Sequence, residues 1–406
     1  MRRFFALVAA RLAYAITHLV GAGGTSLPGL WARAIDPQLL TKLAAEVSRG
    51  TIVVTGTNGK TTVTNLCAQM LRDAGYTVVC NAAGANMPQG VLAAFLRQVP
   101  LVGRLQADYA VIEVDELYAT QICAQVGTEA RPTYVVVTNL FPDQLDRFGS
   151  VEAVREALER AIAHTPENAT VVLNADNPDS LALRAAVGPR AVVTFGIEFG
   201  IENEADYRAT HVAEGVFKVD DVEMATDLSG TYNLSNIMAA LAVARREGVE
   251  FEQIRTTLAY YRTQPGRMER LSVADKTVVL NMAKNPAGFN QSLAFIAAQE
   301  REGEGSYSLL VATNNTPADG ESIDWYADIE YATLRQRPPQ HIVVSGSCAG
   351  EMATFVGAAG VHDGAVQIEA NLHDALRKTL AYDNERLYIL ASYTALFPLR
   401  EELVRR

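Results

Sequence analysis

The segment Thr51–Thr62, TIVVTGTNGKTT, constrains the fold most, because an apolar β-type run breaks at Gly56 and continues as a helical pattern. Glycines let backbone N–H groups face a ligand, and the following helix adds the positive end of its dipole. The pattern is typical of a phosphate-binding loop, in which Lys60 reaches the β- and γ-phosphates and Thr61 binds Mg²⁺. Val54 stands where the common form of this loop has glycine. A glycine turn that only joins a strand to a helix is the structural alternative.

Composition limits the class of protein. A chain of 406 residues with 49% hydrophobic residues can form two or three packed domains. The net charge of −11 argues against broad nucleic-acid binding, which needs a basic face. The four cysteines lack both CxxC spacing and a disulfide-dense pattern, which favours a reducing cytoplasm. They are Cys67, Cys80, Cys123 and Cys348.

The first twenty residues resemble a signal peptide only superficially. Arg2 and Arg3 precede an apolar run, but Arg11 interrupts it and no convincing cleavage site follows. Apolar residues recur at helical spacing, which predicts an amphipathic helix packed on the body. Loose contact with a membrane surface and a cleaved signal are the alternatives.

Apolar β-type runs alternate with helical patterns along the rest of the chain, which predicts an α/β fold with a mostly parallel sheet. The acidic segment Gly196–Asp227 interrupts the alternation and is expected to be a short β excursion or a loop. Gln264-Pro265-Gly266 is the best candidate domain boundary. We therefore expect a helical lead-in at 1–50, a phosphate-binding domain at 51–265 and a second, Rossmann-like α/β domain at 266–406.

Polar residues follow two of the predicted strands. Glu113, in VIEVDE, could hold Mg²⁺ directly or through water, whereas Asp115 and Glu116 are equally well explained as a solvated turn. Ligands in parallel α/β sheets bind at the carboxyl ends of strands, where Asn139 and Asp143 also fall. Asx turns and helix capping are the alternative for these two residues.

Together these residues resemble the Mur ligase superfamily, ATP-dependent enzymes that activate a carboxylate as an acyl phosphate and let an amine displace phosphate. The resemblance covers nearly the whole chain and depends on several motifs in the right order. They are GTNGKTT at Gly56, IEVDE around Glu113, TNLFPDQLDRFG at Thr138, LNADNP at Leu173, SGTYNLSNIMAA around Asn233 and Asn236, and GRMERL at Gly266.

Within the superfamily the chain is most similar to the MurT family, ligase subunits that work with a GatD-like glutaminase on lipid II. The distinguishing motifs are GGTSLPG at Gly23, NAAGAN at Asn81, DQLDRFG at Asp143 and KNPAGFNQ at Lys284. The phosphate loop also starts too early to follow a domain that grips a UDP-sugar. The resemblance implies ATP-dependent amidation of the α-carboxyl of D-isoglutamate in the lipid II stem peptide, for peptidoglycan synthesis. It also implies a cytoplasmic protein, with peripheral contact at the inner face of the membrane left open.

The resemblance also implies roles for particular residues. Lys60 is expected to act on the phosphates, Thr61 and Glu113 to hold Mg²⁺, and Arg267 to approach the ribose or phosphates. Lys284 is expected to face the phosphates or the substrate, once domain closure has excluded water. The remaining residues implied for ATP binding are Gly56, Thr57, Asn58, Gly59, Thr62, Asn233 and Asn236.

The chain departs from the family pattern at three places. Gln144 replaces a histidine, Met282 replaces a ribose-binding aspartate, and no lysine lies between Lys60 and Lys218. A carbamylated lysine in its usual region is therefore excluded, which favours one metal or a water-mediated second one. The segment Gly196–Asp227 has no cysteine, so no structural zinc is expected.

Two features concern the supply of ammonia. Gly346–Gly350, GSCAG, mimics a glutaminase nucleophile elbow with His362 and His373 downstream, but a buried cysteine near a strand end explains it better. The family instead supplies an aspartate that orients the histidine of the partner glutaminase. Asp328 is the first choice for this residue, with Asp319 and Asp324 as alternatives, and any of them could be a plain loop carboxylate.

Two other functions remain open from the sequence. The first is a stand-alone amino-acid ligase such as folylpolyglutamate synthase, which also lacks a UDP-binding domain. The second is a non-catalytic ATP-binding scaffold whose site has degraded at Gln144 and Met282. Phosphate release that depends on folate and glutamate would favour the first, and nucleotide binding without substrate-dependent phosphate release would favour the second.

Overall fold

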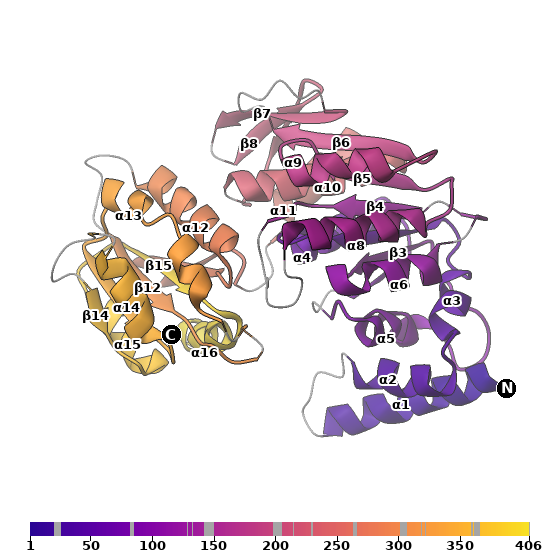
Figure 1. The fold of residues 1–406 in the computed structure, drawn as a ribbon, viewed down its shortest axis with the longest axis horizontal. Coiled ribbons are helices and arrows are strands. Elements are labelled where there is room, and N and C mark those ends of the chain that lie inside the picture. Colours follow the sequence, from indigo (N-terminus) through magenta and orange to yellow (C-terminus); the bar gives the residue numbers. More distant parts are fainter. Residues whose placement is uncertain are drawn as a thin grey trace. The chain divides into compact units, whose positions relative to one another are not determined.

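The computed structural model describes residues 1–19, 26–81, 85–127, 129–131, 133–141, 150–197, 205–213, 215–228, 230–262, 266–300, 307–317, 319–320, 322–358, 360 and 366–405. These residues form two compact units, the first ending at Tyr261 and the second beginning at Arg262 (Figure 1). Each unit contains one sheet of its own. Of the predicted boundary, only Gly266 lies within the described residues.

The sheet of the first unit has nine strands in its described part, in the order β2-β3-β1-β4-β5-β6-β7-β8-β9. All pairs from β2 to β7 are parallel, and β7, β8 and β9 form an antiparallel extension. This confirms the predicted α/β class and the β excursion. The strands are β1 (Gly50–Thr55), β2 (Val78–Cys80), β3 (Tyr109–Glu113), β4 (Thr133–Val137), β5 (Thr170–Asn174), β6 (Ala191–Ile197), β7 (Tyr207–Ala213), β8 (Val216–Val219) and β9 (Val222–Ala225).

Helices cover both faces of this sheet. Its central strands are therefore buried along their whole length. Ile52 and Val54 of β1 share one core with α4 and α10, while the alternation of side chains along a strand directs Val53 to the opposite face. The helices are α1 (Arg2–Leu19), α2 (Leu27–Ile35), α3 (Leu39–Ala44), α4 (Lys60–Asp73), α5 (Pro88–Gln98), α6 (Glu116–Val126), α8 (Val151–Ala163), α9 (Pro178–Ala182), α10 (Thr231–Arg246) and α11 (Phe251–Tyr260), with a 3₁₀ turn at Leu183–Ala186.

The second unit has a six-stranded sheet in its described part, in the order β10-β11-β15-β12-β13-β14. Only the pair β10 and β11 is antiparallel. The strands are β10 (Glu269–Val273), β11 (Lys276–Met282), β12 (Tyr307–Ala312), β13 (His341–Ser345), β14 (Val366–Ile368) and β15 (Arg386–Ala391). The helices are α12 (Pro286–Gln299), the 3₁₀ helix η2 (Asp324–Asp328), α13 (Ala332–Gln336), α14 (Ala349–Ala358), α15 (Leu372–Leu380) and α16 (Tyr393–Arg405).

The N-terminal helix α1 is joined to the first unit through the carboxylate of Glu46. Both carboxylate oxygens of Glu46 accept hydrogen bonds from the Arg3 guanidinium, at 2.5 and 3.0 Å, and one also accepts the N–H of Leu105 at 2.8 Å. Partial burial raises the pKa of Glu46, but these donors outweigh it, so the net pKa is lowered. The ionised form of Glu46 therefore stabilises this junction.

We expect Glu46→Gln to lower the unfolding free energy of the first unit at pH 7 by about 1 kcal/mol. Because the pKa of Glu46 is lowered in the folded protein, its stabilising contribution is fully present above the pKa that glutamate has in the unfolded chain. The contribution is lost as the pH falls through the lower pKa of Glu46 in the folded protein. The difference from wild type should therefore shrink as the pH falls below about 4.3, the ordinary pKa of glutamate. Urea unfolding followed by Trp31 fluorescence, in a Trp325→Phe background, measures it.

The control for this prediction is Glu156→Gln. Glu156 forms an ion pair with Arg160 on the surface of α8, and both side chains are more than half exposed. Its substitution should change the unfolding free energy by a few tenths of a kcal/mol at most. A Glu46→Gln protein that matches this control at pH 7 would contradict the assigned role of Glu46.

Candidate active site

The loop Gly56–Gly59 joins β1 to α4 and requires glycine at both ends. Gly56 has φ +117° and Gly59 has φ +84°, which disfavours any residue with a side chain. A Cβ atom at Gly59 would also lie 2.0 Å from the Oδ1 atom of Asn236 on α10. The loop and the second turn of α10 therefore pack against one another, which places Asn236 beside the predicted phosphate loop. Asn233, one turn earlier on α10, is buried.

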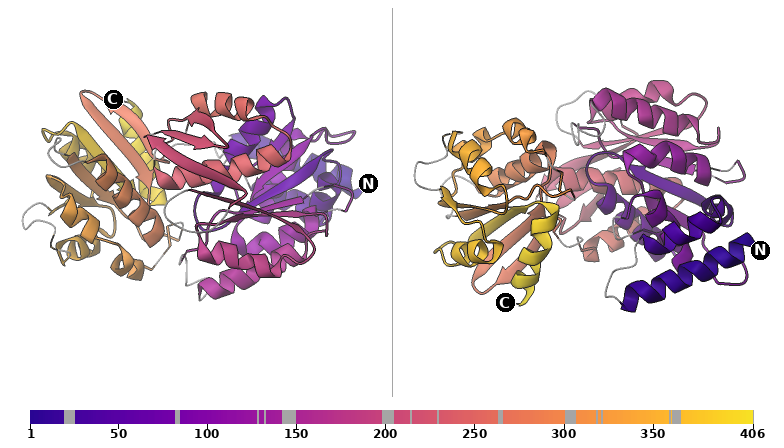
Figure 2. Two further views of the ribbon diagram at one scale, coloured as in Figure 1. Left: turned by 90° about the horizontal axis from the view of Figure 1, so that it is seen from above. Right: turned by 60° about the horizontal axis from the view of Figure 1, so that its bottom comes forward.

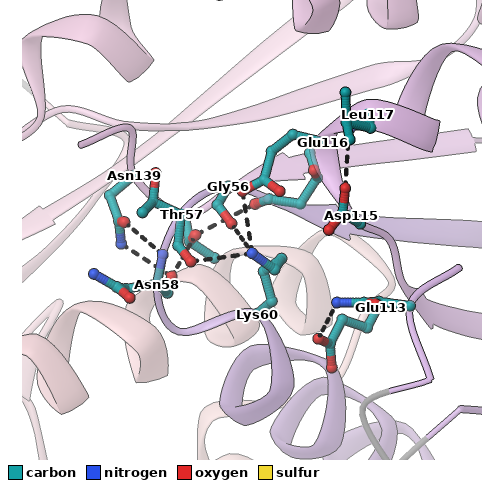
Figure 3. Close-up of polar contacts among 12 residues, drawn as sticks. Gly56, Thr57, Asn58, Lys60, Glu113, Asp115, Glu116, Leu117 and Asn139 are labelled. Atoms are coloured by element: carbon teal, nitrogen blue, oxygen red, sulfur yellow. Dashed lines mark hydrogen bonds and ion pairs between the residues drawn. The ribbon is translucent and has the colours of Figure 1, made fainter. Parts of the chain in front are cut away.

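The next strand along the sheet holds this loop in place. The N–H of Asn58 donates to Oδ1 of Asn139 at 2.9 Å, and Nδ2 of Asn139 donates back to the carbonyl oxygen of Asn58 at 3.1 Å (Figure 3). Thr57 forms a similar reciprocal pair, because its N–H donates to the carbonyl of Asn139 and its hydroxyl accepts the N–H of Phe141. The Thr138 hydroxyl also donates to the carbonyl of Asn58 at 2.7 Å. Asn139 thus has a structural role in shaping the loop.

Lys60, the first residue of α4, folds back under the loop (Figure 3). Its ammonium group donates to the carbonyl oxygens of Gly56 at 2.5 Å and Thr57 at 3.0 Å, and to the carboxylate of Glu116 at 3.1 Å. Burial lowers the pKa of Lys60, but the carboxylates of Glu116, Glu113 and Asp115 raise it by more. Lys60 therefore carries a positive charge at neutral pH.

Glu116 is buried and paired with Lys60, so the solvated-turn alternative is wrong for this residue. Burial raises the pKa of its carboxyl group, and the ammonium group of Lys60 opposes that shift. Asp115 is half-buried and has a structural role, because it caps α6 by accepting the N–H of Leu117 at 3.1 Å. The sequence alone gave no means of separating these neighbours.

Thr61 and Glu113 meet at the carboxyl edge of the sheet. The Thr61 hydroxyl donates to Oε2 of Glu113 at 2.8 Å, and Asn86 donates to its Oε1 at 3.3 Å. Asn81 clamps the backbone of Glu113, accepting its N–H at 2.8 Å and donating to its carbonyl at 2.9 Å. A hydroxyl and a carboxylate are the oxygen ligands that Mg²⁺ prefers, so this pair fits such an ion.

Asn81 and Asn86 were not predicted as site residues. Asn81 directly follows strand β2, and Glu113 is the last residue of strand β3. A polar residue at the end of a buried strand was therefore the sequence signal that could have identified Asn81. Among the described residues, no group of three or more His, Cys, Asp or Glu side chains could hold a metal. Thr62 lies in the first turn of α4 and is buried. Asp143 and Gln144 lie outside the described residues.

The N-terminus of α4 is suited to an anion. The first N–H groups of a helix have no partner within the helix, and the N-cap residue Gly59 provides no side-chain cap. These N–H groups and Lys60 offer positive charge, while Thr61 of α4 and Glu113 at the end of β3 offer oxygen ligands beside them. The arrangement can bind a phosphate group together with a divalent cation.

The remaining predicted residues lie in the second unit. Arg267 stands between Gly266 and Met268, whose φ angles are +71° and +50°. The N–H of Met282, at the end of β11, donates to the carbonyl of Gly266 at 2.9 Å, so the Arg267 turn lies beside that strand end. Lys284 follows at the carboxyl end of β11, just before α12.

The three candidate aspartates differ in environment. Asp319 is buried, accepts hydrogen bonds from Thr316 and Thr394, and serves the structure. Asp324 and Asp328 begin and end η2, and both are exposed. Asn290 of α12 fixes the chain around Asp328, because it donates to the carbonyl of Asp328 at 3.3 Å and accepts the N–H of Glu330 at 2.7 Å. Asp328 is therefore an accessible carboxylate on a fixed segment.

The GSCAG segment has the structural role that the sequence favoured. Cys348 is 1% exposed and directly precedes α14. His373 lies on α15 and contacts Glu402 at 2.5 Å. His362 lies outside the described residues. The buried thiol gives no access to a substrate, so Cys348 is not the nucleophile of a glutaminase.

Residues 54–244 match the family described as the Mur ligase middle domain, and residues 282–396 match the MurT ligase C-terminal family. The MurT subunit of a glutamine-hydrolysing lipid II isoglutaminyl synthase from Staphylococcus aureus strain COL is 29% identical. That alignment covers 100% of this chain and 98% of the relative. The corresponding subunit from Streptococcus pneumoniae strain R6 is also 29% identical, over 98% of this chain and 96% of the relative.

Solved structures show the same fold. MurF from Acinetobacter baumannii superposes with a TM-score of 0.72 at 18% identity, over 92% of this chain and 81% of MurF. MurF ligase from Thermotoga maritima, solved in complex with ADP, gives a TM-score of 0.69 at 19% identity, over 92% and 85% of the two chains. The predicted fold class is confirmed.

We expect Asn139→Ala to raise the hydrogen-exchange rate of the Asn58 amide about tenfold, because one hydrogen bond of the loop is lost. Exchange measured by NMR on the protein without ligand tests this directly. Asn168→Ala is the matched control, because Asn168 is an exposed asparagine whose side chain donates to the carbonyl of Glu129 at 3.1 Å, away from the loop. Equal exchange of the Asn58 amide in both variants would refute the proposed clamp.

Proposed function

Because this chain belongs to the Mur ligase superfamily and has a C-terminal domain of the MurT type, we propose that it is the ligase subunit of a lipid II amidotransferase. It uses ATP to convert the α-carboxyl group of D-isoglutamate in the lipid II stem peptide to D-isoglutamine, during peptidoglycan synthesis. Ammonia comes from a GatD-like glutaminase partner. The four free cysteines agree with a cytoplasmic location, where ATP is available.

In the proposed reaction, an oxygen of the substrate carboxylate attacks the γ-phosphorus of ATP, and the bond to the ADP oxygen breaks. Ammonia then adds to the carbonyl carbon of the acyl phosphate. Inorganic phosphate leaves, a proton is lost from nitrogen, and the amide remains. The protein has to hold the phosphates, shield the acyl phosphate from water and deliver ammonia.

The first unit provides the nucleotide site in this proposal. Lys60 exchanges its contacts with the loop carbonyls for the β- and γ-phosphates, and the N–H groups at the start of α4 bind the same anion. Thr61 and Glu113 would hold Mg²⁺, which supplies charge neutralisation at the phosphates. Asn236 beside Gly59, and Asn233, lie at the adenine side of the site.

The second unit provides residues for the substrate and the partner. Arg267 approaches the ribose or phosphates, and Lys284 faces the acyl phosphate or the phosphates. Asp328 orients the histidine of the glutaminase, because it is the exposed aspartate whose backbone Asn290 fixes. Asp319 is withdrawn from the candidates for this role, because its carboxylate is already bonded to two threonines.

One observation carries the proposal: the Lys60, Thr61 and Glu113 cluster lies in a middle domain that a MurT-type domain follows along the same chain. We expect Lys60→Ala to reduce lipid II-dependent phosphate release about 10²- to 10³-fold, because the charge facing the transferred phosphoryl group is lost. Release is measured with ATP, lipid II and ammonium chloride, with and without a co-expressed GatD-like protein. The product should show the mass change from a carboxyl to a carboxamide group.

Lys218→Ala is the control, because Lys218 is exposed on β8 and pairs only loosely with Glu223 at 3.8 Å. It should retain wild-type turnover. Wild-type turnover in Lys60→Ala would reject the proposed site. Phosphate release only with folate and glutamate would assign the chain to the amino-acid ligases, and nucleotide binding without release would assign a scaffold.

Asp328 is tested by comparing two ammonia sources. Asp328→Asn should reduce glutamine-driven amidation at least about tenfold in the complex with the glutaminase, while amidation from ammonium chloride stays unchanged. Asp324→Asn is the matched control, because Asp324 lies in the same 3₁₀ helix, is exposed and accepts a hydrogen bond from the nearby Ser322 hydroxyl. Equal loss from both nitrogen sources would show that Asp328 supports the fold of the ligase rather than the glutaminase.

A further inference from the structure

The N-terminal helix α1 presents an apolar face to solvent. Phe5 is 57% exposed and Leu12 56%, and Phe4 and Ile16 are also exposed. At 3.6 residues per turn these side chains fall on one side of the helix, together with the partly buried Val8. A helix that only packed on the body would show polar residues on this side.

The opposite side of α1 is fixed to the first unit. Arg3 forms its ion pair with Glu46, the hydroxyl of Tyr14 donates to the carbonyl of Ala93 at 2.7 Å, and Arg11 donates to the carbonyl of Val99 at 2.8 Å. These contacts prevent α1 from rotating about its own axis. The apolar face therefore cannot turn inward while the first unit stays folded.

The short helix α2 extends the apolar face. It packs along α1, as Figure 2 shows in its right view, and exposes Leu30, Trp31 and Ile35. Its other side is buried so closely that a Cβ atom at Gly29 would lie 1.8 Å from the carbonyl oxygen of Gln89 on α5. The two helices thus lie side by side and both expose apolar side chains, which together we call the α1–α2 face.

The charges around the α1–α2 face are basic. On α1, Arg2 and Arg11 flank the two sides of the apolar stripe, and no acidic residue occurs in the helix. Helices α1 and α2 together contain four arginines and no acidic residue, in a chain whose net charge is −11. Positive charge at the rim of an apolar helix face complements anionic lipid headgroups.

We propose that the α1–α2 face binds the surface of an anionic membrane, with its apolar side chains at the boundary between headgroups and acyl chains. Within the described residues no helix has the length and apolarity to cross a bilayer, so the contact is with one leaflet. The biological role of this contact rests on the proposed function, because a lipid-linked substrate is reached from the membrane surface. The binding itself needs neither ATP nor substrate.

The test uses the full chain and vesicles free of lipid II, so that it does not depend on the proposed function. The wild type should sediment with vesicles of phosphatidylglycerol and phosphatidylcholine, and about tenfold less with phosphatidylcholine alone or at high salt. The double variant Phe5→Glu/Leu12→Glu should lose at least about tenfold of the binding. Val212→Glu, at an apolar residue of β7 that is 48% exposed, should bind like the wild type.

Two further measurements keep the result interpretable. Urea unfolding of the double variant should match the wild type, and its turnover on detergent-dispersed lipid II should be unchanged, because Phe5 and Leu12 lie outside the nucleotide site. Equal vesicle binding by the double variant and the wild type would overturn the proposal. So would a wild-type dimer in solution that the double substitution converts to a monomer, because the face would then cover a second copy.

Discussion

The parallel pairing of β1 between β3 and β4 is the constraint on which the candidate site of the first unit depends. Val54 lies in register with Glu113 on one side and with Val136 on the other, so the three chains leave the sheet at the same edge. The parallel pairing therefore brings the glycine loop, the Glu113 carboxylate and Asn139 together at one edge of the sheet. Asn139 and Asn58 convert this proximity into a fixed loop shape.

The charges at this edge are too costly to be explained by stability. The side chains of Lys60 and Glu116 are only 14% and 9% exposed, and the desolvation of such a pair commonly offsets its attraction. Glu113 adds a second carboxylate close to the single lysine, which leaves the cluster with excess negative charge. Bound alone, a nucleotide polyphosphate would be repelled by these carboxylates. A divalent cation between the phosphate and Glu113 would remove that repulsion, so the cluster is suited to a metal–nucleotide pair rather than to either ion alone.

The sequence was sufficient to predict the fold and the meeting of Lys60, Thr61 and Glu113 at one edge of the sheet. Strand-like apolar runs, the glycine loop and Glu113 after a buried strand are local patterns, and parallel sheet topology brings their ends together. Glu116 could not be separated from Asp115, because their difference depends on which side of one helical turn faces Lys60. Asn81 and Asn290 donate hydrogen bonds to the backbone of Glu113 and Asp328, which lie far from them along the chain. A local sequence pattern does not indicate such distant partners.

The MurT-type motif KNPAGFNQ gains a physical explanation from these contacts. Asn285 caps α12 by accepting the N–H of Gly288 at 2.8 Å, which fixes where the helix begins and so where Lys284 leaves β11. Phe289 contacts the ring of Trp325, and Asn290 binds the backbone on both sides of Ile329. One short segment thus positions both Lys284 and the η2 helix that ends at Asp328. If ammonia made by a partner is consumed at the ligase site, helix α12 would keep Lys284 and Asp328 at fixed positions relative to one another.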